Sequence, residues 1–455
     1  MTDEVGTVST AGVTRALAAT VRGLRYDTIP EDAREVARHC LLDFLGTTLA
    51  GSREPLVDIL VEQIARGEGA TEAALIGRRE RATRLTAALV NGAAGHALDF
   101  DDTHTTMSGH PSVPVLPALL ALGETERSNG RSLLAALVAG VELECRLGAL
   151  LGFGHYAAGF HATGTVGTFG AAAACAHLLG LDEHGWLNAL GLAGTQAAGL
   201  KSGFGTMAKP LHAGRAASAG LLSALLARGG FTGQPAIVEV PQGFAATHAG
   251  AEPSMETLER YASRFLIRET LFKYHAACYL THAAIEAATQ LRDRQGFALE
   301  EIGSVEVHVS PTLLNVCNIE RPTTGLEGKF SLRATTALAL LGADTGDPAT
   351  YSDGTMTAPR LTALRDLVHV VPTDQLSPTQ ARVIVESKQQ RVEAAADTGV
   401  PAADLRRQRE QLRRKFLGLA TPVLGASQAA RLADAALAAQ EIGSIADLTH
   451  LACPL

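Results

Sequence analysis

Long apolar segments rich in alanine and glycine recur at helical spacing over the first half of the chain, and this pattern limits its possible folds most. Apolar residues return every three or four positions in 31–49, 81–97, 133–151 and 211–228. Glycine is abundant, with 46 in 455 residues, whereas aromatic residues make up only 4%. Small side chains suit closely packed helices better than a sheet core, which favours β-branched and aromatic residues. The pattern therefore predicts a mainly α protein.

The pattern changes beyond about residue 265. Val305, Val307 and Val309 alternate with polar residues, which is the period of a half-buried strand, and 367–371 and 382–386 look similar. These segments predict a smaller α/β (α+β) domain over 266–401.

After Pro401 the helical spacing returns, in the charged stretch 404–415 and the alanine-rich stretch 426–439. This C-terminal part can pack back on the first helical region. We therefore predict a large, discontinuous all-helical domain formed by both chain ends, 1–265 and 402–455.

Charge and cysteine content exclude several classes of protein. The net charge is −8 and 46% of the residues are hydrophobic, so disorder is excluded and nucleic acid is a disfavoured partner. The six cysteines are scattered without a Cys-x-x-Cys pair, which argues against a zinc or iron–sulfur cage and against a disulfide framework.

No secretory signal is visible, because the sequence starts with acidic residues and lacks a basic region followed by an apolar run. The closest approach to a membrane span is 165–181, but this segment is built of glycine and alanine and contains His177. We interpret it as a buried helix, and expect a cytoplasmic protein without a membrane partner.

Histidines are concentrated in about a quarter of the chain, which indicates a polar site within the apolar helical body. Eight of the fifteen lie between residues 96 and 212: His96, His104, His110, His155, His161, His177, His184 and His212. Near the first of them, Asp99, Asp101 and Asp102 follow a predicted helix, where the helix dipole disfavours negative charge. Lysines, hydrogen-bond donors, a metal or simple exposure can compensate, and a solvated acidic turn is the plain alternative.

Two classes of protein remain open for this segment. A metal-dependent hydrolase would use His96, Asp99, Asp102 and His104, and metal analysis after dialysis against a chelator discriminates it. A metal-free site would instead combine the segment with the polar insertions 159–165, 205–214 and 272–278. Lys209 and His212 are placed near a predicted helix start, where anions are favoured.

The chain resembles the MmgE/PrpD family, which includes 2-methylcitrate dehydratase, cis-aconitate decarboxylase and iminodisuccinate epimerase. The matching motifs occur in order over most of the chain and are shared by members with different reactions. They are Gly95-His96-Ala97-Leu98-Asp99-Phe100-Asp101-Asp102-Thr103, His110-Pro111-Ser112, Gly159-Phe160-His161, Lys209-Pro210-Leu211-His212-Ala213-Gly214, the stretch from Lys273 to Cys278, and Lys329-Phe330-Ser331-Leu332.

The resemblance implies a helical domain from both chain ends with a smaller lid domain, a homodimer, a site between the domains, and chemistry without a metal or organic cofactor. It also implies the site residues. The catalytic set is Asp99, His110, Tyr156, His161 and Lys273, and the substrate-binding set is Thr103, His104, Lys209, His212, His275 and Cys278.

These residue types suit proton removal next to a carboxylate of a small di- or tricarboxylate. Lysine and histidine donors bind the carboxylates and stabilise the enolate-like charge that forms. Lys273 or His110 is the expected base, provided that burial and neighbouring cations lower its pKa. Loss of the β-hydroxide then gives dehydration, reprotonation on the opposite face gives epimerisation, and early loss of CO2 gives decarboxylation.

Two departures from the decarboxylase-like branch bear on the choice. That branch is expected to have a histidine at the position of Cys278 in this chain. It is also expected to have a tyrosine shortly before the pair Arg321-Pro322, where this chain reads Cys317-Asn318-Ile319-Glu320. Both departures weaken a decarboxylase assignment. We predict a 2-methylcitrate dehydratase-like lyase, because dehydratase is the commoner label in the family, with an iminodisuccinate epimerase-like isomerase as the alternative. A decarboxylase, the metal-dependent hydrolase and a non-catalytic scaffold rank lower. For Cys278 itself, a small buried apolar role is favoured over a reactive thiol.

Overall fold

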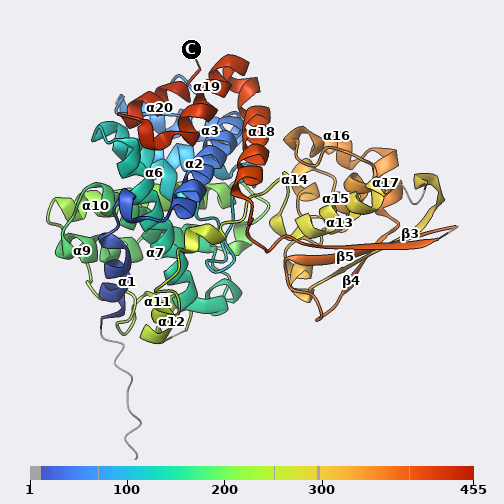
Figure 1. Ribbon diagram of the computed structural model, residues 1–455, viewed down its shortest axis with the longest axis horizontal. Coiled ribbons are helices and arrows are strands. Elements are labelled where there is room, and N and C mark those ends of the chain that lie inside the picture. Colours follow the sequence, from blue (N-terminus) through green and yellow to red (C-terminus); the bar gives the residue numbers. More distant parts are fainter. Residues whose placement is uncertain (1–11, 70, 251, 295–297, 389, 455) are drawn as a thin grey trace, which may run out of the picture. The chain divides into compact units, whose positions relative to one another are not determined.

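The chain forms two compact units, both shown in Figure 1. Unit 1 lies within Met1–Ala97, His104–Thr270 and Leu405–Leu455, and unit 2 within Leu98–Thr103 and Leu271–Asp404. The short segment Leu98–Thr103 thus belongs to unit 2, although the sequence pattern places it in the helical domain. The computed structural model describes residues 12–69, 71–250, 252–294, 298–388 and 390–454.

Unit 1 is almost entirely helical, as the apolar spacing predicts. A small antiparallel pair, β1 (Ala73–Ala74) and β2 (Arg81–Ala82), accompanies the helices. The helices are α1 (Val13–Arg22), α2 (Glu31–Gly51), α3 (Pro55–Leu60), α4 (Arg66–Glu68), α5 (Arg84–His96), α6 (Ser112–Thr125), α7 (Gly130–Ala157), α8 (Ala162–Leu178), α9 (Glu183–Gly194), α10 (Ala208–Arg228), α11 (Phe244–His248), α12 (Met255–Arg260), α18 (Leu405–Leu424), α19 (Ala426–Leu437) and α20 (Ile445–Leu451).

Helices form in the predicted segments, but several of their ends are shifted, most of all that of α18, which runs to Leu424 and not only to residue 415. The segment predicted to start at residue 81 begins as a helix only at Arg84, because Arg81 and Ala82 pair with β1 and the Thr83 hydroxyl caps the helix by accepting from the Thr86 N–H. Helix α7 runs beyond 151 to Ala157, with a break at Gly152, whose φ of 62° falls in the left-handed region.

Small residues let the central helices of unit 1 approach each other closely. Helix α10 packs against α5 and α8. A Cβ added to Gly92 of α5 would lie 2.8 Å from the Cα of Gly214 in α10, and one added to Gly220 would lie 2.5 Å from the Cβ of Ala171 in α8. The glycine and alanine content seen in the sequence therefore has its predicted structural role.

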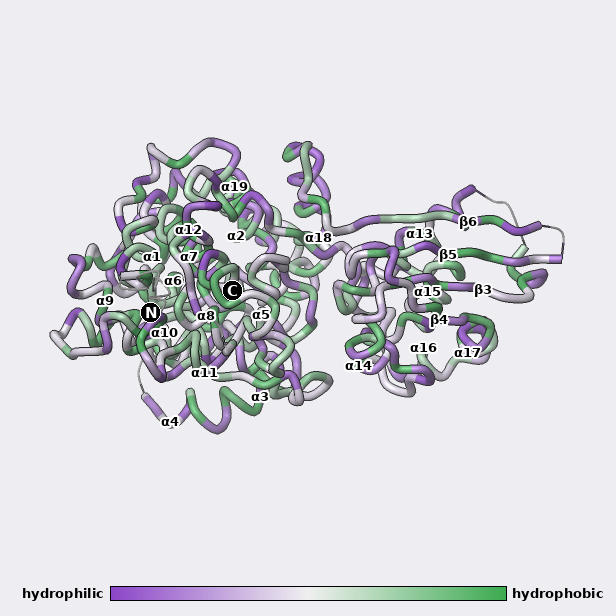
Figure 2. The backbone as a smooth tube through the Cα atoms, turned by 90° about the horizontal axis from the view of Figure 1, so that it is seen from below, coloured by the Kyte–Doolittle hydropathy of each residue, from purple (hydrophilic) through white to green (hydrophobic). Residues whose placement is uncertain are grey.

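Helix α8 was predicted as a buried helix, and all but its last two residues are buried. Figure 2 shows the short helix α4, which has no buried residues, in purple, the colour of hydrophilic residues. Over the described part of the chain, no helix combines the length and the apolar character that a membrane crossing requires.

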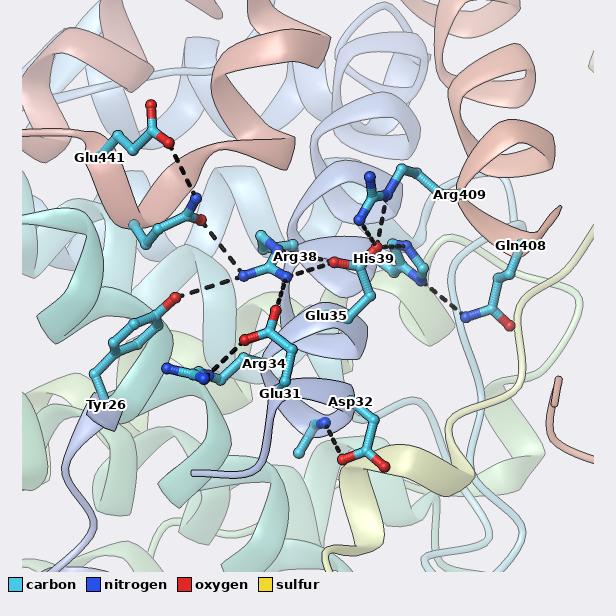
Figure 3. Close-up of polar contacts among 12 residues, drawn as sticks. Tyr26, Glu31, Asp32, Arg34, Glu35, Arg38, His39, Gln408, Arg409 and Glu441 are labelled. Carbon is cyan, nitrogen blue, oxygen red and sulfur yellow. Dashed lines mark hydrogen bonds and ion pairs between the residues drawn. The ribbon is translucent and has the colours of Figure 1, made fainter. Parts of the chain in front are cut away.

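Polar contacts hold the C-terminal helix α18 against α2 within unit 1 (Figure 3). Arg409 Nε donates to Glu35 Oε1 at 2.6 Å, and Lys415 Nζ lies 2.6 Å from Asp43 Oδ1. Between them, His39 Nε2 lies 2.9 Å from Glu35 Oε1, and Gln408 Nε2 lies 2.9 Å from His39 Nδ1. Burial alone would raise the pKa of Glu35, but hydrogen bonds from His39, Arg38 and Arg409 lower it to about 2.

Unit 2 is built on a mixed four-stranded sheet in its described residues. The strands lie in the order β4-β3-β5-β6, with β3 parallel to β4 and the other neighbours antiparallel. Three strands match the predicted segments, whereas β6 was missed because only part of it alternates. The strands are β3 (Ile302–Val309), β4 (Val368–Pro372), β5 (Gln380–Ser387) and β6 (Arg391–Asp397).

The alternating valines of β3 are buried in unit 2, where helices pack on the sheet. Val305, Val307 and Val309 are fully buried, and Val307 pairs with Val370 and Val383 on the neighbouring strands. Helix α13 contacts β5 and β6, and α15 contacts β4. The helices of unit 2 are α13 (His282–Asp293), α14 (Gly325–Gly328), α15 (Leu332–Leu340), α16 (Asp353–Met356) and α17 (Pro359–Arg365).

Candidate active site

Four histidines and a lysine of unit 1 form a compact group, which we call the imidazole cluster: His96, His110, His161, His212 and Lys209. The ring of His96 lies 4.5 Å from that of His110 and 5.7 Å from that of His161, measured between centroids. His161 Nδ1 lies 3.2 Å from His212 Nδ1. His96, His161 and Lys209 are buried, and the other two side chains are half-buried.

Helix ends bring the imidazole cluster together. His96 is the last residue of α5, His161 precedes the first turn of α8, and Lys209 and His212 lie in the first turns of α10. The backbone N–H of His110 donates to Thr163 Oγ1 at 3.1 Å, which fixes His110 beside the start of α8. Because α10 packs closely on both α5 and α8, residues far apart in sequence meet at one place.

Positive neighbours set the charge of the imidazole cluster. The pKa of His161 lies well below its usual value, mainly because the ring is buried and further because Lys209 and the other three histidines disfavour a second positive charge. Burial and Lys209 also lower the pKa of His212. At neutral pH the ring of His161 is therefore neutral, and the group offers imidazoles and an ammonium to a negatively charged ligand.

A cavity of about 390 Å³ opens beside the imidazole cluster within unit 1. His212 lines it, together with Thr168, Gln196, Ser202 and Arg215. Cavities of this size hold small molecules, and most of these side chains present hydrogen-bond donors. Arg215 was not singled out from the sequence.

Unit 2 carries a second polar group around Lys273. Its Nζ donates to Asp99 Oδ1 at 2.8 Å and to the Asp99 backbone oxygen at 2.6 Å, and its side chain is 1% exposed. Thr103 N–H donates to the Leu271 carbonyl oxygen, and Leu271 N–H donates in return, so the segment carrying Asp99 is tied to the residues just before Lys273. Asp99 has a φ of 52°, a rare backbone conformation for a residue other than glycine.

Lys273 differs from the prediction in its charge. Burial alone would lower its pKa, as expected of a lysine base, but the charges of Asp99 and Asp101 and the hydrogen bond to Asp99 raise it above the usual value. The prediction of a lowered pKa is therefore wrong, and Lys273 is a buried ammonium. Lysines were one of the predicted ways to compensate the acidic residues at 99–102, and for Asp99 the structure shows Lys273 in that place.

Sequence reasoning also missed Lys329 as a site residue. Its side chain is buried, and its Nζ donates to the Leu98 carbonyl oxygen at 3.0 Å, directly before Asp99. The motif Lys329-Phe330-Ser331-Leu332 was noted only as a family match. Its place in that motif was the available signal.

The remaining predicted site residues have other neighbours in the structure. His104 Nε2 lies 2.9 Å from the Leu266 carbonyl oxygen, and burial lowers the pKa of this histidine. Lys201 Nζ donates to the Tyr156 carbonyl oxygen and lies 3.7 Å from the centroid of its ring. His275 contacts Thr345 Oγ1 at 2.7 Å and Glu286 Oε1 at 3.1 Å.

Several histidines of the enriched region are structural. His155 Nε2 contacts Thr165 Oγ1 at 2.7 Å and its Nδ1 contacts the His248 carbonyl oxygen at 2.9 Å. His177 Nε2 contacts the Leu24 carbonyl oxygen at 2.8 Å, and His184 is exposed at the start of α9. Half of the eight histidines therefore belong to the imidazole cluster, and the enrichment overstates the size of the site.

Within unit 1, His96 and His110 are close enough to share a metal ion, but protein zinc sites normally have three or four protein ligands. His104, required by the hydrolase hypothesis, bonds instead to Leu266 and has Glu269 and Arg264 as its charged neighbours. The hydrolase hypothesis therefore loses His104 as a ligand, whereas His96 and His110 remain close together.

Two family models match the chain in order, the MmgE/PrpD N-terminal domain over residues 15–256 and the MmgE/PrpD C-terminal domain over residues 275–441. The chain belongs to the MmgE/PrpD family.

Its curated relatives include three described as cis-aconitate decarboxylases or as similar to them. The cis-aconitate decarboxylase of Aspergillus terreus is 30% identical over 356 residues, which cover 73% of this chain and 72% of that protein. The human cis-aconitate decarboxylase is 31% identical over 290 residues, 62% of this chain and 60% of that protein. A cis-aconitate decarboxylase-like protein of Aspergillus oryzae is 31% identical over 313 residues, 64% of each chain.

Proposed function

We propose that this protein is a lyase that acts on a small di- or tricarboxylate by removing a proton next to a carboxylate, without a metal or organic cofactor. The observation that carries the proposal is the imidazole cluster with Lys209 at the start of α10. A buried lysine beside imidazoles at a helix start favours a carboxylate ligand, and the neighbouring cavity has the size of a small-molecule site. The lyase names of the curated relatives support the same class.

The proposal gives each group a role that its charge allows. Lys209, His161 and His212 bind substrate carboxylates, because they supply an ammonium and imidazole donors beside the cavity. His110 is the proposed base, in place of Lys273. The Lys273 ammonium, oriented by Asp99, stabilises the enolate-like charge or returns a proton.

Elimination of water is the outcome we propose first. The base takes the proton next to the carboxylate, the electron pair forms the new double bond, and the β-hydroxide leaves as water. Cys278 and the stretch Asn318-Ile319-Glu320 separate this chain from the decarboxylase-like pattern. The names of the relatives make release of CO2 from a tricarboxylate the second candidate, and epimerisation of a dicarboxylate the third.

The test is turnover of methylcitrate, cis-aconitate and iminodisuccinate in D2O, followed by NMR. The proposal expects deuterium at the carbon next to a carboxylate together with an unsaturated product. His110→Ala and His161→Ala should suppress both signals, whereas His184→Ala, which changes an exposed histidine, should not. No exchange and no turnover with any di- or tricarboxylate would overturn the proposal.

The hydrolase alternative has its own measurement. Dialysis against a chelator should leave the activity unchanged. Bound stoichiometric zinc or iron, with activity that the chelator removes, would replace the proposal by metal-dependent chemistry. The expected homodimer is part of the proposal and is checked by light scattering on the full-length protein.

A further inference from the structure

The cavity beside the imidazole cluster carries a positive charge that the protein does not neutralise. Arg215, on the second turn of α10, lines this cavity. Among the described residues, no hydrogen bond or ion pair engages the Arg215 side chain, and no acidic side chain lines the cavity. Arg228 at the other end of the same helix differs, because its Nη1 lies 2.8 Å from Glu126 Oε1. The Arg215 guanidinium is therefore available to an anion.

Two other polar side chains of the cavity wall already bond within the protein. Gln196 Nε2 donates to the Leu192 carbonyl oxygen at 3.1 Å and to Ser223 Oγ at 2.9 Å. Thr168 Oγ1 donates to the Gly164 carbonyl oxygen at 2.7 Å. Most of the remaining lining residues are glycine, alanine or leucine. The cavity thus combines a largely apolar wall with few free donors, as small-molecule sites generally do.

His212 is the wall that the cavity shares with the imidazole cluster. Its Nδ1 lies 3.2 Å from His161 Nδ1. The opposite edge of the ring lies toward Gly203, another lining residue, since a Cβ added there would lie 3.5 Å from Cε1 and 3.9 Å from Nε2. Burial and Lys209 lower the pKa of His212, so the ring is neutral at pH 7. Arg215 is then the one permanent charge among the described lining residues, which matches one carboxylate.

Three donors follow each other at intervals of three residues along α10. Residues three apart are neighbours on a helix surface, so Lys209, His212 and Arg215 form a row from a buried to an exposed side chain. Six residues rise about 9 Å along the helix axis. A five-carbon acid with a hydrogen bond of about 3 Å at each end covers about 11 Å. One small acid can therefore contact both ends of the row.

We propose that Arg215 binds one terminal carboxylate of the substrate in this cavity, and that the site thereby selects a tricarboxylate over a dicarboxylate. Lys209 and His161 bind the carboxylate nearer the reacting carbon, on the other side of His212. The contact with Arg215 is made to an arm that does not react, so it strengthens binding without changing the chemical step. This inference rests on the proposed function, because it names the substrate class of the same site.

The first experiment measures binding to the full-length protein by isothermal titration calorimetry. Its two probes are propane-1,2,3-tricarboxylate and propane-1,2-dicarboxylate, which lacks one terminal carboxylate. We expect the wild-type protein to bind the tricarboxylate about tenfold more tightly, the size of one charged hydrogen-bonded contact. Arg215→Met should remove this preference and leave the affinity for the dicarboxylate unchanged.

Two further variants show whether the preference comes from the cavity arginine. Arg215→Lys keeps the charge but loses the two-pronged donor, so part of the preference should remain. Arg228→Met, an exposed arginine of the same helix, should keep all of it. Equal affinity of the wild-type protein for both acids overturns the proposal, as does a preference that persists in folded Arg215→Met.

Steady-state kinetics separate this inference from the proposed function. With a tricarboxylate substrate, Arg215→Met should raise KM about tenfold at unchanged kcat. Turnover whose KM does not depend on Arg215 overturns the inference and leaves the proposed function intact. If the tricarboxylate preference in binding depends on Arg215 but no polycarboxylate is turned over, the proposed function fails while the carboxylate site at Arg215 stands.

Discussion

The imidazole cluster of unit 1 and the Lys273 group of unit 2 show how neighbours decide the charge of a buried base. His161 and Lys273 are both almost fully buried, and burial disfavours the charged form of each. His161 is surrounded by positive groups and its pKa falls further, whereas Lys273 is paired with Asp99 and its pKa rises. Burial alone therefore does not identify a base, because the sign of the neighbouring charges can reverse its effect.

The largest expected effect is that of Lys273→Met. Loss of the ammonium should lower kcat by about a thousandfold, the size expected when a donor to a developing negative charge is removed. Leaving Asp99 buried without its partner should also lower the melting temperature. Steady-state kinetics and thermal unfolding measure the two effects, with Lys388→Met at an exposed lysine of unit 2 as the control. Unchanged kcat in a folded variant would contradict the role of Lys273.

Lys209→Met tests the other half of the comparison. Loss of one charged hydrogen-bond donor should raise KM about 10- to 100-fold. Because Lys209 is one of the charges that lower the pKa of His161, the variant should also raise that pKa, which NMR of the labelled histidine measures. Arg66→Met, at an exposed surface ion pair, is the control. A pKa of His161 that stays constant would show that burial alone sets it.

Glu35 is the corresponding case for a carboxylate, because hydrogen bonds from its partners lower its pKa more than burial raises it. The pKa of Glu35 is about 2 in the folded protein, against 4.5 for an ordinary glutamate. The stability that the ionised carboxylate contributes is therefore present above pH 4.5 and is lost as the pH falls toward 2. Glu35→Gln should lower the free energy of unfolding at pH 7 by about 2 kcal/mol, since three partners lose their carboxylate. Urea unfolding between pH 3 and 7 measures it.

In that experiment the destabilisation caused by Glu35→Gln should shrink toward pH 3. Gln428→Ala in α19, which removes a neutral side chain instead, serves as the control and should show no such dependence. The same loss of stability at every pH would mean that packing, not charge, holds α18 on α2.

Gly92→Ala is the smallest change that we predict. The added Cβ meets the Cα of Gly214, so α5 and α10 must separate slightly, at a cost of about 1 kcal/mol. His96 lies at the end of α5 and His212 on α10, so this small shift should also weaken substrate binding. Gly67→Ala in α4, where the added atom meets nothing within 4 Å, is the control. Equal stability of the two variants would contradict the close packing.

Sequence reasoning predicted most of the elements because their signals are local. Apolar spacing located α2, α7 and α10, and alternation located β3, β4 and β5. It missed β6, of which only part alternates, and the pairing of Arg81 and Ala82 with β1, which depends on residues seven and nine positions away. The family motifs located Lys209, His161 and Lys273, but not Lys329 as a buried lysine or Arg215 beside the cavity.

The amino-acid sequence by itself determined the family, the helical character of the first half and the small-residue packing, because periodicity and motifs are written along the chain. Only the tertiary structure decided which four of eight histidines meet and that Lys273 is an ammonium. Lys273 and Asp99 are 174 positions apart, and His161 and His212 are 51. Electrostatic and desolvation effects act through space over a few ångströms, so they follow the folded contacts rather than the order of residues.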